Sequence, residues 1–88
     1  MTPLEDYLRR VRELLASLSG SLTDAERAEV LHLIDHDECG EALRTLAWIV
    51  VEEDKRIPTT AIAAIRELSH GLVADDDLPE NLDSYASD

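Results

Sequence analysis

The amino-acid sequence predicts an all-α protein, a compact antiparallel four-helix bundle with an acidic C-terminal tail. Four segments repeat apolar residues at steps of three and four, as on one side of a helix, and alternating strand patterns are absent from the sequence. With no Phe, one Trp and two Tyr among 88 residues, the core has to be aliphatic, which favours packed helices over a β-sandwich. The length allows one helical domain, residues 1–73, followed by a tail, residues 74–88.

The first helix is predicted from about Pro3 to Ser19. Thr2 and Glu5 have the spacing of a capping box, and Pro3 suits the first helical position. Gly20 is expected to adopt a left-handed conformation that ends the helix. The apolar side of this helix consists of Leu4, Tyr7, Leu8, Val11, Leu14, Leu15 and Leu18.

The second helix is predicted over residues 24–36, after a second capping box formed by Thr23 and Glu26. Its apolar stripe consists of Val30, Leu31, Leu33 and Ile34. The third helix is predicted to begin between residues 38 and 41 and to end near residue 54. Its buried face consists of Cys39, Ala42, Leu43, Leu46, Ala47 and Val50.

The fourth helix is predicted to open at Pro58 and to end near Gly71. Its apolar face consists of Ile62, Ile65, Leu68, Ser69 and Leu72. The tail that follows holds six acidic residues and no basic one. The sequence leaves two states open for it, docked on the bundle or disordered.

The charge of the chain excludes several classes of function. Eight basic residues against twenty acidic ones give a net charge of −12, so direct binding to nucleic acid is not expected. The longest apolar run, residues 46–51, is far short of a membrane span, and no signal peptide is recognisable. The single cysteine, Cys39, cannot form an internal disulfide. We therefore expect a cytoplasmic protein with no membrane association.

Acidic residues gather at both ends of the third predicted helix. One cluster lies at the connection before it, and the other lies near its C-terminal end. The simpler interpretation is that such residues keep the protein soluble and complement the helix dipole. The other interpretation is a docking face for a basic partner, whose approach clustered carboxylates accelerate. The clusters consist of Asp35, Asp37, Glu38 and Glu41, and of Glu52, Glu53 and Asp54.

Trp48 favours the docking interpretation. On a helical wheel it lies about 200° from Leu46, beside Glu41, Arg44 and Glu52, and so points away from the buried stripe. An exposed tryptophan among charges resembles an interface hot spot. The alternative is that the tail folds back and covers the ring. The candidate partner-binding residues are Asp35, Asp37, Glu38, Glu41, Trp48, Glu52 and Glu53.

Other chemistry has little support in the sequence. His32 and His36 lie one helical turn apart, but two histidines without further ligands are expected to be solvated, not metal-bound. The chain has no glycine-rich phosphate loop and no recognisable nucleophile with its base. We therefore expect no catalytic residue, no metal and no cofactor.

The stretch Leu33-Ile-Asp-His-Asp-Glu-Cys-Gly-Glu-Ala-Leu43, with Leu46 and Ala47, resembles the immunity proteins of the MafI type. In those proteins a short motif leads into a helix: an acidic residue, a spacer, Gly and then Ala-Leu. An Ile-Pro pair, here Ile57-Pro58, opens their last helix. The resemblance covers about residues 22–72. Where the family usually reads Gly-Glu-Tyr-Gly, this chain reads Asp-Glu-Cys-Gly over residues 37–40.

The resemblance implies a cytoplasmic antitoxin that neutralises the toxic domain of a bacterial polymorphic toxin. Toxic nucleases carry basic clefts, so a partner of that kind agrees with a charge of −12. Two other functions stay open: an acidic nucleic-acid mimic or regulatory module, and a homo-oligomeric helical module. The free protein is expected to be a monomer or a weak dimer.

Overall fold

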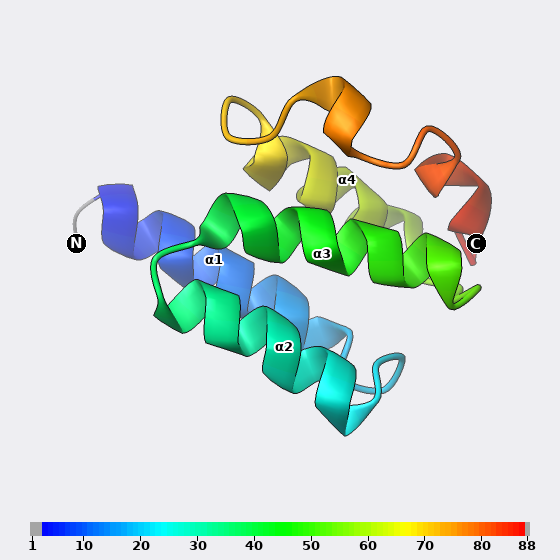
Figure 1. Cartoon of the computed structure of the whole chain (residues 1–88), viewed down its shortest axis with the longest axis horizontal. Coiled ribbons are helices and arrows are strands. Elements are labelled where there is room, and N and C mark those ends of the chain that lie inside the picture. The colour runs from blue at the N-terminus through cyan, green and yellow to red at the C-terminus, as the bar shows by residue number, and fades with distance from the viewer. Residues whose placement is uncertain (1–2, 88) are drawn as a thin grey trace.

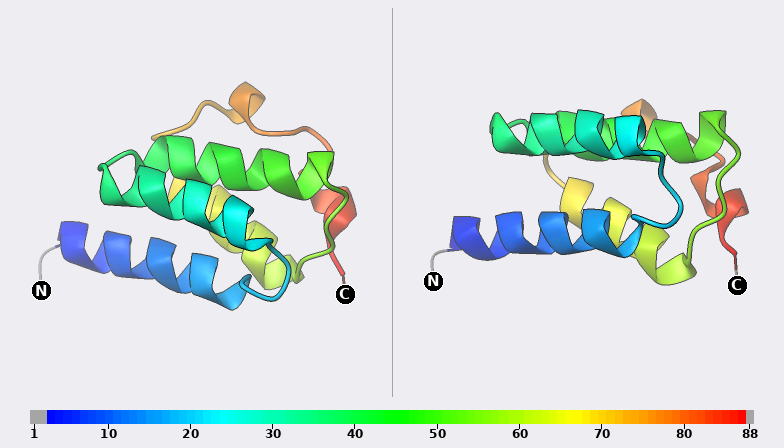
Figure 2. Two further views of the ribbon diagram at one scale, coloured as in Figure 1. Left: turned by 60° about the horizontal axis from the view of Figure 1, so that its bottom comes forward. Right: turned by 90° about the horizontal axis from the view of Figure 1, so that it is seen from below.

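Four helices make up most of the computed structural model, which describes residues 3–87 (Figure 1). They are α1 (Pro3–Ser17), α2 (Asp24–Asp35), α3 (Cys39–Glu52) and α4 (Thr59–Ser69). Each helix runs antiparallel to the one before it, and α2 and α3 form one layer over a second layer of α1 and α4 (Figure 2). The predicted all-α four-helix bundle is confirmed.

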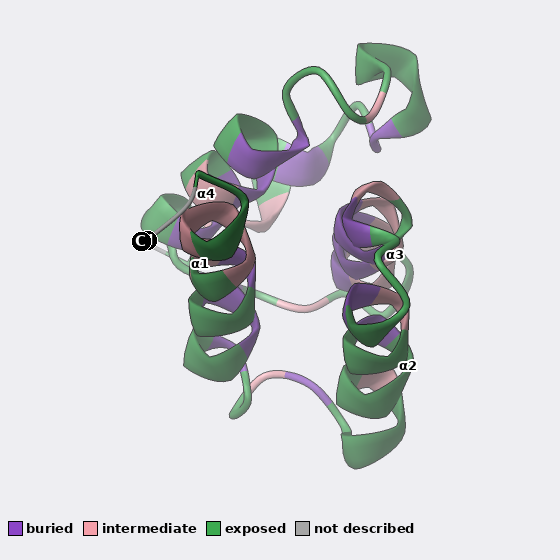
Figure 3. Cartoon of the chain, turned by 90° about the vertical axis from the view of Figure 1, so that its left-hand side faces the viewer, coloured by how far each residue is buried: buried purple, intermediate pink, exposed green. Residues whose placement is uncertain are grey.

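The core lies between these two layers, where the apolar stripes of all four helices face one another (Figure 3). The predicted face of α3 is confirmed in full, because each of its six residues is buried. In the described part of the chain, no helix has the length and apolar character needed to cross a membrane. The residues that are at most 1% exposed are Leu18, Ile34, Ala42, Leu43, Leu46, Ala47, Val50, Ile57, Ile65, Ser69 and Leu82.

The exit from α1 differs from the prediction. Among the glycines, Gly71 has the positive φ, 83°, so the left-handed conformation expected at Gly20 is wrong. The chain instead leaves α1 through successive tight turns, in which the N–H groups of Ser21 and Leu22 donate to the carbonyl oxygen of Leu18 at 2.9 and 3.2 Å. These turns bury Leu18 and Leu22. At the other end of α1, Leu4 is 66% exposed, so its predicted place on the apolar side is wrong. The capping box expected at Thr2 involves a residue outside the described range.

The capping box that opens α2 is confirmed. The Glu26 N–H donates to Thr23 Oγ1 at 3.1 Å, and the Thr23 N–H donates to Glu26 Oε1 at 2.8 Å. The same carboxylate oxygen lies 3.0 Å from Lys55 Nζ, which ties the start of α2 to the end of α3. Leu31, however, is 38% exposed, so its predicted burial is wrong. It lines an open groove between α1 and α2, beside Arg12.

Two aspartates with φ in the left-handed region follow the ends of α2 and α3. Asp37 has a φ of 60° and follows α2, and Asp54 has a φ of 50° and follows α3. Aspartate is one of the few residues other than glycine that is enriched in this conformation. The structure therefore ends α2 and α3 one or two residues before the predicted ends at residues 36 and 54.

The end of α4 shows a similar difference. The helix stops at Ser69, and Gly71 reverses the chain. Leu72 therefore lies beyond the helix and is 59% exposed, so its predicted place on the apolar face is wrong.

The acidic tail packs on the bundle as two short 3₁₀ turns, η1 (Asp75–Asp77) and η2 (Leu82–Tyr85). It lies across α3 and α4, and η2 contacts both helices (Figure 3). Leu78 is 5% exposed and Leu82 is 0% exposed, so both belong to the core. The Ile57 N–H donates to the Tyr85 carbonyl at 3.1 Å, and the Ser87 N–H donates to the Ile57 carbonyl at 2.8 Å.

Candidate functional site

The connection between α2 and α3 carries the first of the predicted acidic clusters. Asp35 Oδ1 accepts a hydrogen bond of 2.7 Å from Arg12 Nη2, so an arginine of α1 offsets this charge. Glu38 is the N-cap residue of α3, but its side chain makes no capping hydrogen bond. Within residues 3–87, the carboxylates of Asp37 and Glu38 have no ion-pair partner.

Glu41 forms an ion pair within the first half of α3. Its two carboxylate oxygens accept hydrogen bonds from Arg44, at 2.9 Å from Nη2 and at 3.3 Å from Nε. These hydrogen bonds, and then the attraction of the guanidinium charge, hold the pKa of Glu41 below its usual range. Glu41 and Arg44 therefore largely neutralise each other.

The second half of α3 lines a cleft between α2 and α3, which we call the α2–α3 cleft. It has a volume of about 320 Å³. Residues four apart on a helix form a row, so α3 supplies two adjacent rows to the lining, and α2 supplies Glu29. One row is Arg44, Trp48 and Glu52, and the other is Thr45, Ile49 and the C-cap residue Glu53.

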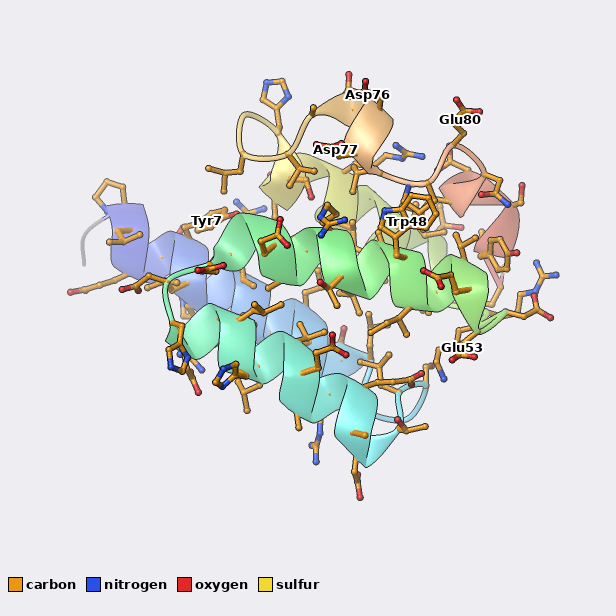
Figure 4. All side chains as sticks on the ribbon, in the orientation of Figure 1. Tyr7, Trp48, Glu53, Asp76, Asp77 and Glu80 are labelled. Carbon is orange, nitrogen blue, oxygen red and sulfur yellow. The ribbon has the colours of Figure 1, made fainter. Side chains whose placement is uncertain are left out.

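Trp48 forms a wall of the cleft on the side of the tail. Its ring is partly buried, and its indole N–H donates to the carbonyl oxygen of Asp77 at 2.8 Å. Figure 4 shows Trp48 at the edge of α3 beside the tail, and Glu53 near the C-terminal end of that helix. The tail thus holds the orientation of the indole ring, while Trp48 stays half-buried and lines the cleft.

The α2–α3 cleft carries negative charge. In the described part of the chain, Glu29, Glu52 and Glu53 have no ion-pair partner. Arg44 is the one basic residue of the lining, and its guanidinium is bound to Glu41 one turn further toward the start of α3. Three carboxylates therefore face the cleft with little compensation.

The seven predicted partner-binding residues do not form one site. Trp48, Glu52 and Glu53 share the α2–α3 cleft. Glu38 and Glu52 stand at opposite ends of α3, whose 14 residues span about 21 Å. The acids at the α2–α3 connection therefore form a separate patch, and two of them, Asp35 and Glu41, are already paired with arginine.

Sequence reasoning missed four residues of the cleft lining, Glu29, Arg44, Thr45 and Ile49. The three on α3 could have been found, because each precedes or follows a predicted site residue by one or four positions. Glu29 could not be assigned from its own helix, since only the packing of α2 against α3 brings it to the cleft.

The histidines and the cysteine that could bind a metal or act as a nucleophile are not arranged for either role in the described residues. The rings of His32 and His36 stack with centroids 4.1 Å apart, and His36 Nδ1 lies 2.8 Å from the His32 carbonyl oxygen. In residues 3–87, no group of three or more potential ligands is placed to hold a metal ion. Burial raises the pKa of the Cys39 thiol above its usual value, which disfavours the reactive thiolate.

We compared the chain with known protein families, with curated proteins and with solved structures, and none of them matches it.

Proposed function

We propose that this chain is an immunity protein that binds and neutralises a basic bacterial toxin domain through the acidic surface of α3. The observation that carries the proposal is the α2–α3 cleft, whose lining includes Trp48 and the carboxylates of Glu29, Glu52 and Glu53. A partly buried aromatic ring beside unpaired carboxylates suits a protein partner that supplies cations. The resemblance of residues 22–72 to MafI-type immunity proteins supports the assignment of that partner as a toxin.

Charge also supports a basic partner. A net charge of −12 steers a cationic domain toward the protein and increases the rate of encounter. Toxic nucleases need a positively charged cleft for their substrate. We therefore propose a nuclease domain as the toxin, and the cytoplasm as the place where the two meet.

The test begins with the purified chain as bait in a lysate of its source bacterium, eluted with a salt gradient. The captured domain is then expressed in a bacterial host with and without this chain. We expect release only at high salt, growth arrest by the captured domain alone, and recovery of growth with the chain. Capture of a DNA-binding protein that is not toxic, or only of copies of the chain, would overturn the immunity function.

Three double variants, each of which removes two negative charges, locate the binding surface. Glu52→Gln/Glu53→Gln changes the cleft, and Asp37→Asn/Glu38→Gln changes the α2–α3 connection. In the control variant, Asp76→Asn/Glu80→Gln, the altered side chains point away from α3 (Figure 4). We expect the cleft variant to slow association with the toxin by about tenfold, and the control to slow it much less.

A further inference from the structure

We infer that the α2–α3 cleft binds an arginine side chain of the partner, with the guanidinium group against the ring of Trp48. This inference rests on the proposed function, because the arginine belongs to the protein that the chain neutralises. It goes further in naming the chemical group that the cleft recognises and the residue that selects it.

The indole ring of Trp48 is prepared for such a contact. Its N–H group is already bound to the Asp77 carbonyl at 2.8 Å, so the accessible part of the ring can attract a cation only through its π electrons. Tryptophan is the aromatic residue that binds cations best, and arginine is the cation found most often on it. Because the tail holds the ring in place, binding costs little ordering of this side chain.

The carboxylates that line the cleft with Trp48 determine the charge of the ligand. Glu52 lies one helical turn after Trp48 in the same row, and Glu29 reaches the cleft from α2. Neither has an ion-pair partner within residues 3–87. A guanidinium group stacked on Trp48 can donate hydrogen bonds in its own plane to such carboxylates, which the compact ammonium group of lysine cannot do in the same way.

The protein's own arginine does not occupy this position. Arg44 precedes Trp48 by one turn, but its Nε and Nη2 atoms both donate to Glu41, which lies in the opposite direction along α3. The chain contains the same kind of contact elsewhere, since the guanidinium carbon of Arg56 lies 5.2 Å from the centroid of the Tyr85 ring. The Trp48 ring is therefore left for a cation from outside.

The test uses the fluorescence of Trp48, which is the single tryptophan of the chain. The full chain is titrated at constant ionic strength with an acetylated and amidated Gly-Arg-Gly peptide, and with the same peptide carrying lysine or uncharged citrulline. We expect saturable binding of the arginine peptide in the millimolar range, about threefold weaker binding of the lysine peptide, and none of the citrulline peptide.

Two variants test the named carboxylates, and circular dichroism verifies that both remain folded. Glu29→Gln/Glu52→Gln should weaken binding of the arginine peptide by about fivefold, whereas the control Asp76→Asn/Glu80→Gln should weaken it less than twofold. Equal binding of the three peptides, or equal loss in the two variants, would overturn the inference. Because no toxin is present in this titration, its failure is distinguishable from failure of the immunity function, which the growth assay measures.

Discussion

Replacing Leu82 with alanine tests whether residues 75–87 belong to the same cooperative unit as the four helices. Leu82 lies in η2 and is 0% exposed. The change removes three buried carbon atoms, and the transfer of their hydrocarbon to water costs about 2.4 kcal/mol. The cavity left behind adds to this cost, so we expect a total loss of about 3 kcal/mol in the free energy of unfolding.

That loss is large for a chain of this size. A domain of 88 residues has an unfolding free energy of about 4 to 13 kcal/mol. Leu72→Ala is the matched control, because Leu72 is 59% exposed and lies just after α4, where the chain leads into the tail. Its replacement should change the free energy of unfolding by less than about 0.5 kcal/mol.

The assay is urea denaturation followed by two signals. Fluorescence of Trp48 reports on the contact between α3 and the tail, because the indole N–H binds the Asp77 carbonyl. Far-ultraviolet circular dichroism reports on the helices. We expect the two transitions to coincide in the wild-type protein. A loss below about 0.5 kcal/mol for Leu82→Ala, or a fluorescence transition at lower urea than the dichroism transition, would refute a tail that is integral to the core.

Three further predictions concern a carboxylate, a thiol and two glycines. The capping hydrogen bond from the Thr23 backbone, and then the contact with Lys55, lower the pKa of Glu26 in the folded protein below its usual 4.5. The ionised Glu26 side chain therefore stabilises the fold at neutral pH, and this contribution is lost as the pH falls through the folded pKa. Glu26→Gln should therefore lower stability at pH 7 and flatten the decline of stability below about pH 4.5 in thermal melts at a series of pH values; a parallel decline would contradict this. Burial raises the pKa of Cys39, so iodoacetamide should label it at least about tenfold more slowly in the native protein than in denaturant, and equal rates by mass spectrometry would disprove the protection. Gly71→Ala should lower the free energy of unfolding by about 1 kcal/mol, because Gly71 has a φ of 83°. Gly20→Ala should be neutral or slightly stabilising in urea melts, because Gly20 has no positive φ and the added Cβ would have no neighbour within 4 Å.

The helices were predictable because local patterns determine them. Apolar residues at steps of three and four located the core faces, and the Thr23 and Glu26 capping box located the start of α2 to the residue. The helix ends were less predictable. Asp37 and Asp54 take the left-handed conformation that glycine usually supplies, whereas Gly20 does not use it. A residue type permits such a conformation, but the packing of the flanking residues decides whether it occurs.

The candidate site was predictable only in part, because it depends on contacts between helices. The position of Trp48 on the outer side of α3 followed from the helical wheel, and so did its proximity to Glu52. The contribution of Glu29 and the hydrogen bond to Asp77 depend on how α2 and the tail pack on α3. Likewise, nothing in the local sequence around Asp35 indicates that Arg12, 23 residues earlier, pairs with it.

The order of the helices in space has a consequence for the speed and sequence of folding. Each helix packs against its neighbour in the chain, so most of the bundle forms from contacts with short loops to close. Two sets of contacts join parts that are distant in the sequence. The tail packs on α3, where the Trp48 indole N–H donates to the Asp77 carbonyl. The helix α1 closes on α4, where Tyr7 Oη donates to the Leu68 carbonyl at 2.6 Å across 61 residues. Chains dominated by local contacts fold in microseconds to milliseconds. We therefore expect the α2–α3 pair to form early and the α1–α4 contact to form after the rate-limiting step, so that Tyr7→Phe accelerates unfolding and leaves the refolding rate nearly unchanged.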